Sequence, residues 1–330
     1  MPQPDTMRAW RVTTLGEPAD ALVLDEVPVP APGPGELLLR VGAVAANFPD
    51  VLLARGQYQV RPELPFIPGV ECSGTIAALG DGVTGVAVGD RVVAAKIGVL
   101  AEYAVVPASA VQKIPDALTD VAASGLTIAY QTAWFALHRR AQLRADEWLL
   151  VHAAAGGVGA ATVQLGAAAG ARVIGVVGSA AKAEVARAAG AEHVIVRDVD
   201  DVVASVKEIT GGHGADVVFD PVGGDAFQAS TRCVAFEGRI VVIGFASGEI
   251  PTLTVSHTLV KNYSVVGLYW GLYQERFPEL VADAHADLMR LFEGGAIDPV
   301  VDHVVPFAEA PAALTALASG KTVGRVVISL

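Results

Sequence analysis

The sequence predicts an α/β protein of two domains: an irregular β domain and a domain built on a doubly wound parallel sheet. A length of 330 residues suits about two domains. Residues up to about 128 are dense in glycine and proline and carry short β-rich segments. From about residue 132, apolar segments alternate with alanine-rich ones, and a glycine-rich turn at 153–159 separates the first pair.

In the first domain, three short segments are expected to form antiparallel strands. They are Leu37–Val41, Ser73–Ile76 and Arg91–Val93. They stand between turn-forming runs such as Pro32-Gly33-Pro34-Gly35 and Gly80-Asp81-Gly82. This texture predicts an irregular, mostly antiparallel β domain.

In the second domain, the alternation of apolar strands and alanine-rich helices predicts βαβ units and a parallel sheet buried on both faces. The expected strands are 148–153, 172–177, 193–196, 216–220, 239–243 and 263–268. The expected helices are 160–169, 180–189, 200–210 and 277–292. The chain then ends on strand-like segments at 300–305 and 323–328. We assign 1–131 together with 271–330 to the first domain and 132–270 to the second.

The composition raises the question of a membrane protein, because 52% of the residues are hydrophobic and only 18% are charged. Glycines and Arg172 interrupt the most apolar region, 149–177. A spanning helix needs roughly 20 mostly apolar residues, so we expect no membrane partner.

Three further observations bear on location and partners. The beginning, MPQPDTMRAWRV, has neither an apolar signal core nor an Arg/Ser-rich leader. The two cysteines, Cys72 and Cys233, do not form a CxxC pair. We therefore expect a cytoplasmic protein. The formal charge of −12 opposes binding to a phosphate backbone, so nucleic acid is not an expected partner.

The turn after the first strand of the second domain fits a dinucleotide fingerprint with alanine in the first glycine position. Gly156 would let the backbone approach a pyrophosphate at the helix N-terminus, and Gly159 would let the helix pack against the strand. The alternative is a glycine-rich core turn, which the flanking strand and helix disfavour. The predicted cofactor residues of this Rossmann-type turn are Ala154, Ala155, Gly156, Gly157, Val158 and Gly159.

The segment Val177-Gly178-Ser179-Ala180-Ala181-Lys182 favours NADPH over NADH. An NAD-binding chain carries a carboxylate in this position for the ribose 2′-hydroxyl, and this segment has no acid. Ser179 can donate to a 2′-phosphate, and Lys182 can reach it as a point charge. The alternative roles, Ser179 as a helix N-cap and Lys182 as a solvated cation, are compatible with this one.

Several segments jointly resemble the medium-chain dehydrogenase/reductase superfamily over the full length of the chain. Within it, the chain resembles the zinc-free quinone oxidoreductase (ζ-crystallin-like) branch, which implies a GroES-like β domain and a Rossmann domain. The matching segments are 47–50 (NFPD), 65–71 (PFIPGVE), 88–92 (VGDRV), 101–103 (AEY), 153–159 (AAAGGVG), 177–182 (VGSAAK) and 220–224 (DPVGG).

The resemblance also bears on metal binding. In the related zinc alcohol dehydrogenases a cysteine ligand stands where this chain has Asn47, and a histidine ligand where it has Val70. The four-cysteine zinc loop expected after Arg91 is absent. Zinc needs three or four Cys, His or carboxylate ligands, and the seven histidines are scattered. We expect no metal; a zinc alcohol dehydrogenase is the alternative.

For the substrate site, the resemblance implies a polar pocket wall at Asn47 and Asp50, with Tyr58 at the pocket mouth and Thr127 near the nicotinamide. The alternative is that Asn47 and Asp50 only cap the helix 51–55. Asp50 is the better candidate for a structural role, because an unpaired buried carboxylate is costly.

Two further residues belong to the predicted cofactor site. The resemblance implies that Phe245 follows the strand whose loop covers the cofactor; a core position is the alternative. Arg197 stands where relatives often carry a tyrosine. An arginine there can stack on adenine and pair with a 2′-phosphate, or it can be a solvated strand end.

These observations predict an NADPH-dependent oxidoreductase that transfers hydride to a quinone. Without zinc there is no strong Lewis acid, and a conjugated acceptor needs only hydrogen-bond donors such as Asn47 to stabilise the developing oxyanion. The proton comes from solvent or from Tyr58. An enone or enoyl-thioester reductase and a non-catalytic NADPH-binding protein are the alternatives. We expect a homodimer, and the aromatic segment 267–273 either shapes a pocket or forms a dimer contact.

Overall fold

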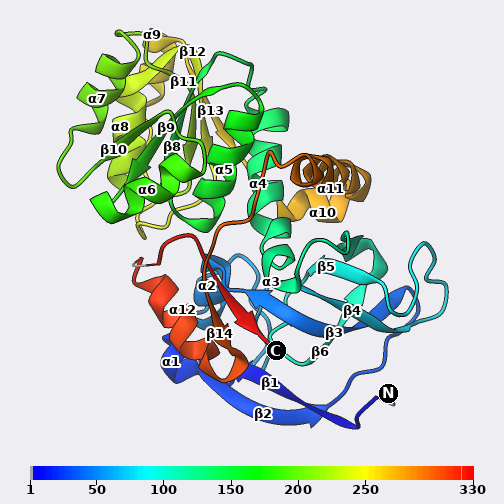
Figure 1. Ribbon diagram of the computed structural model, residues 1–330. Coiled ribbons are helices and arrows are strands. Elements are labelled where there is room, and N and C mark those ends of the chain that lie inside the picture. The colour runs from blue at the N-terminus through cyan, green and yellow to red at the C-terminus, as the bar shows by residue number, and fades with distance from the viewer. Residues whose placement is uncertain (1–2, 321) are drawn as a thin grey trace. The chain divides into compact units, whose positions relative to one another are not determined.

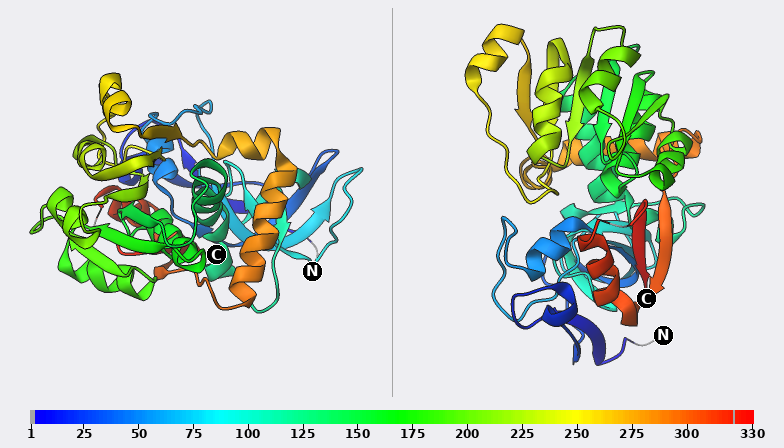
Figure 2. Two further views of the ribbon diagram at one scale, coloured as in Figure 1. Left: turned by 90° about the horizontal axis from the view of Figure 1, so that it is seen from above. Right: turned by 90° about the vertical axis from the view of Figure 1, so that its left-hand side faces the viewer.

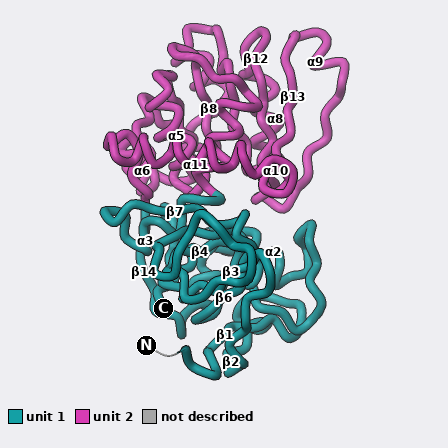
Figure 3. The backbone as a smooth tube through the Cα atoms, turned by 90° about the vertical axis from the view of Figure 1, so that its right-hand side faces the viewer, with its two compact units in different colours: residues 1–128, 301–330 teal, residues 129–300 magenta. Residues whose placement is uncertain are grey.

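The computed structural model describes residues 3–320 and 322–330 and divides into two compact units (Figures 1 and 3). Unit 1 comprises residues 1–128 and 301–330, and unit 2 comprises residues 129–300. The mixed α/β class, with an irregular β unit and a parallel-sheet unit, is confirmed.

Residues 271–300 group with unit 2, whereas the sequence analysis places them in the first domain. Side-chain contacts explain the difference. Trp134 Nε1 donates to Asp287 Oδ2 over 2.8 Å, and the Tyr130 hydroxyl donates to the Asp298 carbonyl over 3.2 Å. These bonds tie helix α11 (Pro278–Glu293) and the chain after it to the start of unit 2.

Unit 1 is built on a seven-stranded sheet in which all pairings are antiparallel except that of β14 with β15. The order is β14-β15-β3-β4-β5-β7, and β6 also pairs with β3. The strands are β3 (Glu36–Ala45), β4 (Glu71–Leu79), β5 (Arg91–Ala95), β6 (Tyr103–Pro107), β7 (Val111–Lys113), β14 (Val301–Pro306) and β15 (Arg325–Ser329). A separate hairpin joins β1 (Thr6–Val12) and β2 (Leu22–Pro28).

The two turn-forming runs of unit 1 lie against each other. The Gly35 amide donates to the Asp81 carbonyl over 2.8 Å. A Cβ added to Gly80 would lie only 1.9 Å from the Gly33 carbonyl oxygen, so only glycine fits at this approach. The contact holds the start of β3 next to the end of β4. Short helices lie beside the sheet: α1 (Pro18–Ala21), α2 (Phe48–Ala54), α3 (Asp120–Ala123) and α12 (Ala310–Ala318).

Unit 2 contains a six-stranded parallel sheet with helices on both faces (Figures 1 and 2). The order is β10-β9-β8-β11-β12-β13, so the chain reverses its direction of travel between β8 and β11. The strands are β8 (Trp148–His152), β9 (Arg172–Val177), β10 (His193–Val196), β11 (Ala215–Asp220), β12 (Val234–Val242) and β13 (Ser264–Gly267). The helices between them are α5 (Gly157–Ala168), α6 (Ala180–Ala188), α7 (Val202–Ile209), α8 (Gly224–Cys233) and α9 (Val255–Lys261).

A helical run that the sequence analysis did not predict precedes β8. It consists of a wide π-type turn η2 (Leu126–Tyr130), the helix α4 (Gln131–Trp134) and a second π-type stretch η3 (Phe135–Arg140). Much of the run is buried, so no polar stripe marks its period in the sequence.

The apolar composition is explained by hydrophobic cores in both units. One cluster in unit 1 packs around Leu37, Val44 and Cys72, and one in unit 2 packs around Leu150, Val218 and Phe227. Within residues 3–320 and 322–330, no helix has both the length and the apolar character needed to cross a membrane.

Candidate functional site

The glycine turn of unit 2 connects β8 to α5, and one of its glycine positions has no room for a side chain. Ala153 has φ +52°, in the left-handed region, and Gly156 is the N-cap of α5. A Cβ on Gly159 would lie 2.1 Å from the Ala153 carbonyl oxygen, whereas a Cβ on Gly156 would lie 3.3 Å from it. Gly159 is therefore required by the close approach of helix and turn. The predicted residues Ala154, Ala155, Gly157 and Val158 lie in the same turn and in the first turn of α5.

The other predicted cofactor residues follow the carboxyl ends of neighbouring strands. Gly178 and Ser179 follow β9, Arg197 follows β10, and Phe245 follows β12. Because the chain reverses between β8 and β11, this edge holds the crevice where ligands bind in open parallel sheets. The structure therefore brings the glycine turn and the predicted phosphate-binding residues to one edge of the sheet.

Cationic and hydroxyl groups gather at the start of α6. A Cβ on Gly178 would lie 3.4 Å from Arg197 Nη2, so the guanidinium lies against that glycine. Ser179 is the N-cap of α6, but within the described residues its side chain makes no capping bond. Lys182 lies in the first turn of α6. Asp198 Oδ1 lies 3.6 Å from Arg197 Nε.

A buried polar group missed by the sequence analysis lies behind the same edge. His152, the last residue of β8, has its Nε2 2.8 Å from the Ser230 hydroxyl. Burial lowers the pKa of His152, which keeps the ring neutral near pH ~7. Asp220 Oδ1 accepts from the amides of Val222 and Gly223, over 2.9 and 3.0 Å. This carboxylate thereby shapes the turn after β11.

In unit 1, the opening of α2 is held by a buried side-chain network. Asn47 is the N-cap, and its backbone amide donates to Asp50 Oδ2 over 2.9 Å. Asn47 Nδ2 donates to the Ala45 carbonyl over 3.0 Å and to Glu71 Oε1 over 2.8 Å. Asn47 Oδ1 accepts from Arg325 Nη1 over 3.2 Å. Helix α2 thus begins at Phe48, earlier than the predicted 51–55.

Glu71 is the centre of this network. Its side chain is fully buried, and its Oε1 pairs with Nη1 of Arg325, a residue that is only 6% exposed. Its Oε2 accepts from the backbone amide of Ile128 over 2.7 Å. Glu71 therefore links the first residue of β4 to α2, to the π-type turn η2 and to the first residue of β15. A buried ion pair of this kind is costly to break, because removing one partner leaves an uncompensated charge.

The network occupies the side-chain amide of Asn47 in this structure. A guanidinium can only donate, so Arg325 fixes Oδ1 of Asn47 on its own side and turns Nδ2 toward Ala45 and Glu71. The amide nitrogen carries two hydrogens, and both are used. Asn47 therefore has no N–H group left to donate to a substrate oxygen, and Asn47 and Asp50 together cap α2.

Two polar atoms of this region lack partners in the described chain. Thr127, in η2, has a buried hydroxyl oxygen without a hydrogen bond, and Asp50 Oδ1 is likewise buried and unpaired. Burial, with a further contribution from the negative charge of Glu71, raises the pKa of Asp50 to about 7. Asp50 therefore carries a proton over much of the range below neutral pH.

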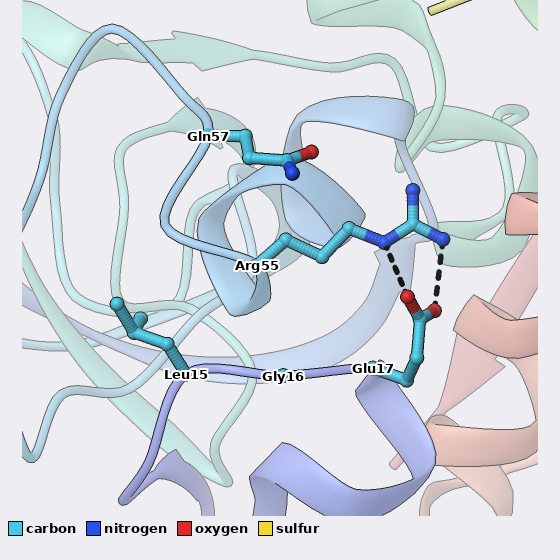
Figure 4. A pocket seen from close by; sticks show the side chains of 5 residues that line it. All are labelled: Leu15, Gly16, Glu17, Arg55 and Gln57. Atoms are coloured by element: carbon cyan, nitrogen blue, oxygen red, sulfur yellow. Dashed lines mark hydrogen bonds and ion pairs between the residues drawn. The ribbon is translucent and has the colours of Figure 1, made fainter.

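Tyr58 and one wall of a cavity in unit 1 follow the end of α2. Tyr58 is half-buried in the bend that follows the helix. A cavity of about 570 Å³ has Leu15, Gln57 and the pair Arg55–Glu17 in its wall (Figure 4). The two guanidinium–carboxylate bonds of that pair, 2.9 and 2.8 Å, satisfy its charged groups mutually. We therefore assign no chemistry to this cavity.

The residues near Asn47 do not fit a catalytic zinc. Glu71 is committed to Arg325, and the Cys72 thiol packs in the hydrophobic core, where burial raises its pKa. Across residues 3–320 and 322–330, no three His, Cys, Asp or Glu side chains form a group that could hold a metal ion.

Comparisons with known proteins match both units. Residues 33–116 match the alcohol dehydrogenase GroES-like domain, and residues 157–286 match the zinc-binding dehydrogenase family. The quinone oxidoreductase-like protein 2 homolog of Nematostella vectensis is 37% identical over 326 residues, which cover 98% of this chain and 88% of that protein. The 2-haloacrylate reductase of a Burkholderia species is 33% identical, covering 94% of this chain and 95% of that protein.

A solved structure agrees with these relatives. The Escherichia coli quinone oxidoreductase complexed with NADPH superposes with a TM-score of 0.91 at 30% identity, covering 98% of this chain and 100% of that one. The resemblance and the GroES-like and Rossmann folds predicted from the sequence are confirmed. With both units matched and relatives similar over nearly their whole length, the chain belongs to the medium-chain dehydrogenase/reductase superfamily, among its quinone oxidoreductase-like members.

Proposed function

We propose that the chain is an NADPH-dependent oxidoreductase that transfers hydride to a quinone. The observation that carries the proposal is the turn between β8 and α5, where backbone amides are open to an anion and Gly159 allows close packing. The similarity to an NADPH-bound quinone oxidoreductase supports the same choice of cofactor and acceptor.

The residues at this edge of the sheet fit the phosphates of NADPH. The N-terminus of α5, beginning at Gly157, offers backbone amides to a pyrophosphate. The Ser179 hydroxyl, free of any capping bond in the described chain, together with Lys182 and Arg197, suits a 2′-phosphate. Phe245, 37% exposed after β12, offers a ring that can cover the cofactor.

In the proposed reaction, the cofactor supplies the hydride, and residues of the protein polarise the acceptor and supply the proton. NADPH, when bound, supplies the hydride, and the acceptor also takes up a proton to complete its two-electron reduction. We assign Thr127 to polarise the acceptor, because its buried hydroxyl lacks a partner and a ligand oxygen would satisfy it. Asp50 holds a proton near neutral pH and, with Tyr58, is our candidate proton source.

An α,β-unsaturated carbonyl is the second candidate acceptor. The similarity to a 2-haloacrylate reductase favours it. Both acceptors are conjugated, so charge that arrives with hydride spreads onto oxygen and no metal is needed to polarise an isolated carbonyl.

Oxidation of NADPH by the purified protein against a panel of acceptors tests the proposal. We expect turnover with benzoquinone or phenanthrenequinone, weaker turnover with hexenal or a crotonyl thioester, and none with saturated hexanal. Dominant turnover of an enone or enoyl thioester would replace the quinone by the second candidate. Tight NADPH binding without turnover on any acceptor would support a non-catalytic binding protein instead.

A variant pair tests the choice of cofactor in the same assay. Lys182→Ala should raise the Kd for NADPH about tenfold or more and leave the Kd for NADH nearly unchanged, because only NADPH carries the 2′-phosphate. Lys207→Ala, on α7 of the same unit, removes the same charge elsewhere and serves as the control. Equal effects on both nucleotides would contradict the assignment.

We also propose a homodimer that forms through the edge of the unit 2 sheet. Strand β13 lies at the end of the sheet, so one row of its backbone N–H and C=O groups is open to pairing. Leu259 and Val260 on α9 are each 77% exposed, and Val265 on β13 is 36% exposed. An apolar edge of this kind gains by being covered.

We infer a cytoplasmic location from the cysteines. Cys72 and Cys233 are both buried free thiols, which suits a reducing compartment. Recovery of the protein in a membrane or secreted fraction of its own cells would contradict this location.

A further inference from the structure

A second cavity lies at the far edge of unit 2, where the aromatic segment 267–273 meets η3 and α10 (Gly271–Arg276). Its volume is about 310 Å³, which is within the range of small-molecule pockets, about 300–1,000 Å³. Three arginines, Arg139, Arg140 and Arg276, contribute to its wall, and none of the residues that line it is acidic.

These arginines differ from most others in the chain. Arginines elsewhere, such as Arg172, Arg239 and Arg325, form ion pairs with nearby carboxylates. Among the described residues, none of the three cavity arginines has a carboxylate within ion-pair distance. The protein has a formal charge of −12, so three unneutralised cations around one cavity make a local positive field that favours an anion.

The cavity also has an apolar, aromatic wall. The Tyr273 ring lies 4.4 Å from the ring centroid of Phe135 and 6.3 Å from that of Phe277. Leu272 is 40% exposed and Phe277 is 47% exposed. The exposed apolar groups would lose contact with water if a ligand filled the cavity.

One of the arginines is already oriented. Arg140 Nε donates to the Gly267 carbonyl at the end of β13 over 3.1 Å. This bond holds the guanidinium at the cavity wall, and less side-chain entropy is then lost when its other N–H groups bind an anion. A guanidinium offers paired donors that match carboxylate and phosphate oxygens.

The cavity is separate from the nucleotide turn. The glycine turn and the α6 cations lie at the carboxyl ends of β8, β9 and β10, whereas Gly267 is at the carboxyl end of β13, the last strand on the other side of the sheet. Of the residues assigned to NADPH, Phe245 follows the neighbouring strand β12. Four strand spacings separate β9 from β13, or about 19 Å at ~4.8 Å per strand. None of the residues that line the cavity is among those assigned to the phosphates of NADPH.

We propose that this cavity binds a small amphipathic anion, with an aromatic or compact apolar body and one carboxylate or phosphate group. The apolar body packs against Leu272, Phe277 and Tyr269, and the anionic group accepts hydrogen bonds from Arg139 and Arg276 beside the oriented Arg140. The aromatic segment 267–273 therefore forms a pocket wall, one of the two roles left open by its sequence. The proposal does not depend on which acceptor the enzyme reduces.

Calorimetric titration of the full chain, saturated with NADPH to occupy the nucleotide site, tests the proposal. The ligands are naphthoate, naphthyl phosphate and the neutral isostere naphthamide. We expect the two anions to bind at least tenfold more tightly than the amide, and the preference between them identifies a carboxylate or a phosphate ligand. Equal affinity for anion and amide, or no binding of either anion, would overturn the proposal.

Variants locate the binding. Arg139→Gln with Arg276→Gln should weaken naphthoate binding about tenfold or more, since each removes a charge-assisted contact at the surface. Leu272→Ser should weaken naphthoate and naphthamide alike. Arg144→Gln removes one exposed arginine of the same unit outside the cavity, and it should change affinity less than about twofold. Unchanged binding in the double arginine variant would place the anion elsewhere and reject the site.

Discussion

At the residue scale, the buried network of unit 1 uses some polar atoms to hold α2 and leaves other polar atoms without partners. The side-chain amide of Asn47 donates to the Ala45 carbonyl and to the Glu71 carboxylate. Thr127 and Asp50 keep polar atoms without partners in the described chain. Buried polar groups without partners are costly, so they mark places where a substrate or a proton can compensate.

Asp50 makes stability depend on pH. Its pKa rises from 3.8 to about 7 in the folded chain. Below pH ~4 the carboxyl is protonated in both the folded and the unfolded chain, so it no longer makes the free energy of unfolding depend on pH. Between about pH 4 and 7 the unfolded chain loses the proton while the folded chain keeps it, so the free energy of unfolding falls as pH rises. The full change corresponds to about 4 kcal/mol.

Asp50→Asn keeps an acceptor for the Asn47 amide and removes the titration. Denaturant unfolding at several pH values should show wild-type stability falling relative to that of the variant between about pH 4 and 7, by up to about 4 kcal/mol. Asp116→Asn, at an exposed carboxylate, should track the wild type. Parallel curves for wild type and Asp50→Asn would show that the carboxyl titrates normally.

At the element scale, two glycines in the turn from β8 to α5 serve different purposes: Gly159 allows the helix to pack closely, and Gly156 is expected to let the cofactor approach the backbone. A Cβ on Gly159 would meet the Ala153 backbone at 2.1 Å, so Gly159→Ala must displace the helix and should lower the free energy of unfolding by about 1–3 kcal/mol. Gly156 has φ −85°, which alanine adopts without strain. Gly156→Ala should therefore cost less than about 1 kcal/mol.

Cofactor binding should separate the two variants further. A methyl group on Gly156 stands where the pyrophosphate must approach the backbone, so Gly156→Ala should bind NADPH at least about tenfold more weakly although it is folded. Thermal unfolding and nucleotide fluorescence on one preparation give both readings. If Gly156→Ala binds NADPH normally, the pyrophosphate does not lie on this turn.

The elements that the sequence predicted are those with a local signature. The strands β3, β4, β8, β9 and β11 carry apolar runs between turns, and their predicted positions agree with the structure within a few residues. The sequence analysis did not predict the run from η2 to η3 or the helix α8. In the first, burial erases the polar stripe, and the second begins at a glycine, Gly224, with φ +51°.

The centre of the candidate site had no local signature at all. The sequence analysis named Glu71 only as part of a family segment and did not single out Arg325. Their pairing joins residues 254 positions apart, so no local pattern indicates it. Single-sequence patterns report neighbours in the chain, so they predict the glycine turn but not a contact closed by the last strand. The bonds that Asn47 makes to Glu71 and Arg325 likewise join residues far apart in the chain.

At the scale of the whole molecule, the exposed edge of unit 2 predicts self-association. Sedimentation velocity at micromolar concentration should show a dimer for the wild type. Leu259→Glu combined with Val265→Glu should give a monomer, because two carboxylates would be buried without partners in the interface. Val199→Glu, at a valine that is 82% exposed elsewhere in unit 2, should stay dimeric. A monomeric wild type would refute the assignment.

The interrupted chain path of unit 1 has a consequence for synthesis. Unit 2 is one continuous segment, whereas β14 and β15 reach unit 1 only after unit 2 has been made. At ~5–20 residues per second, about 10–40 s pass between the emergence of Ile128 and that of Arg325. During that interval the Glu71 carboxylate lacks its cation and β3 lacks its β15 neighbour, so the nascent amino-terminal part keeps an open sheet edge until β15 has been made.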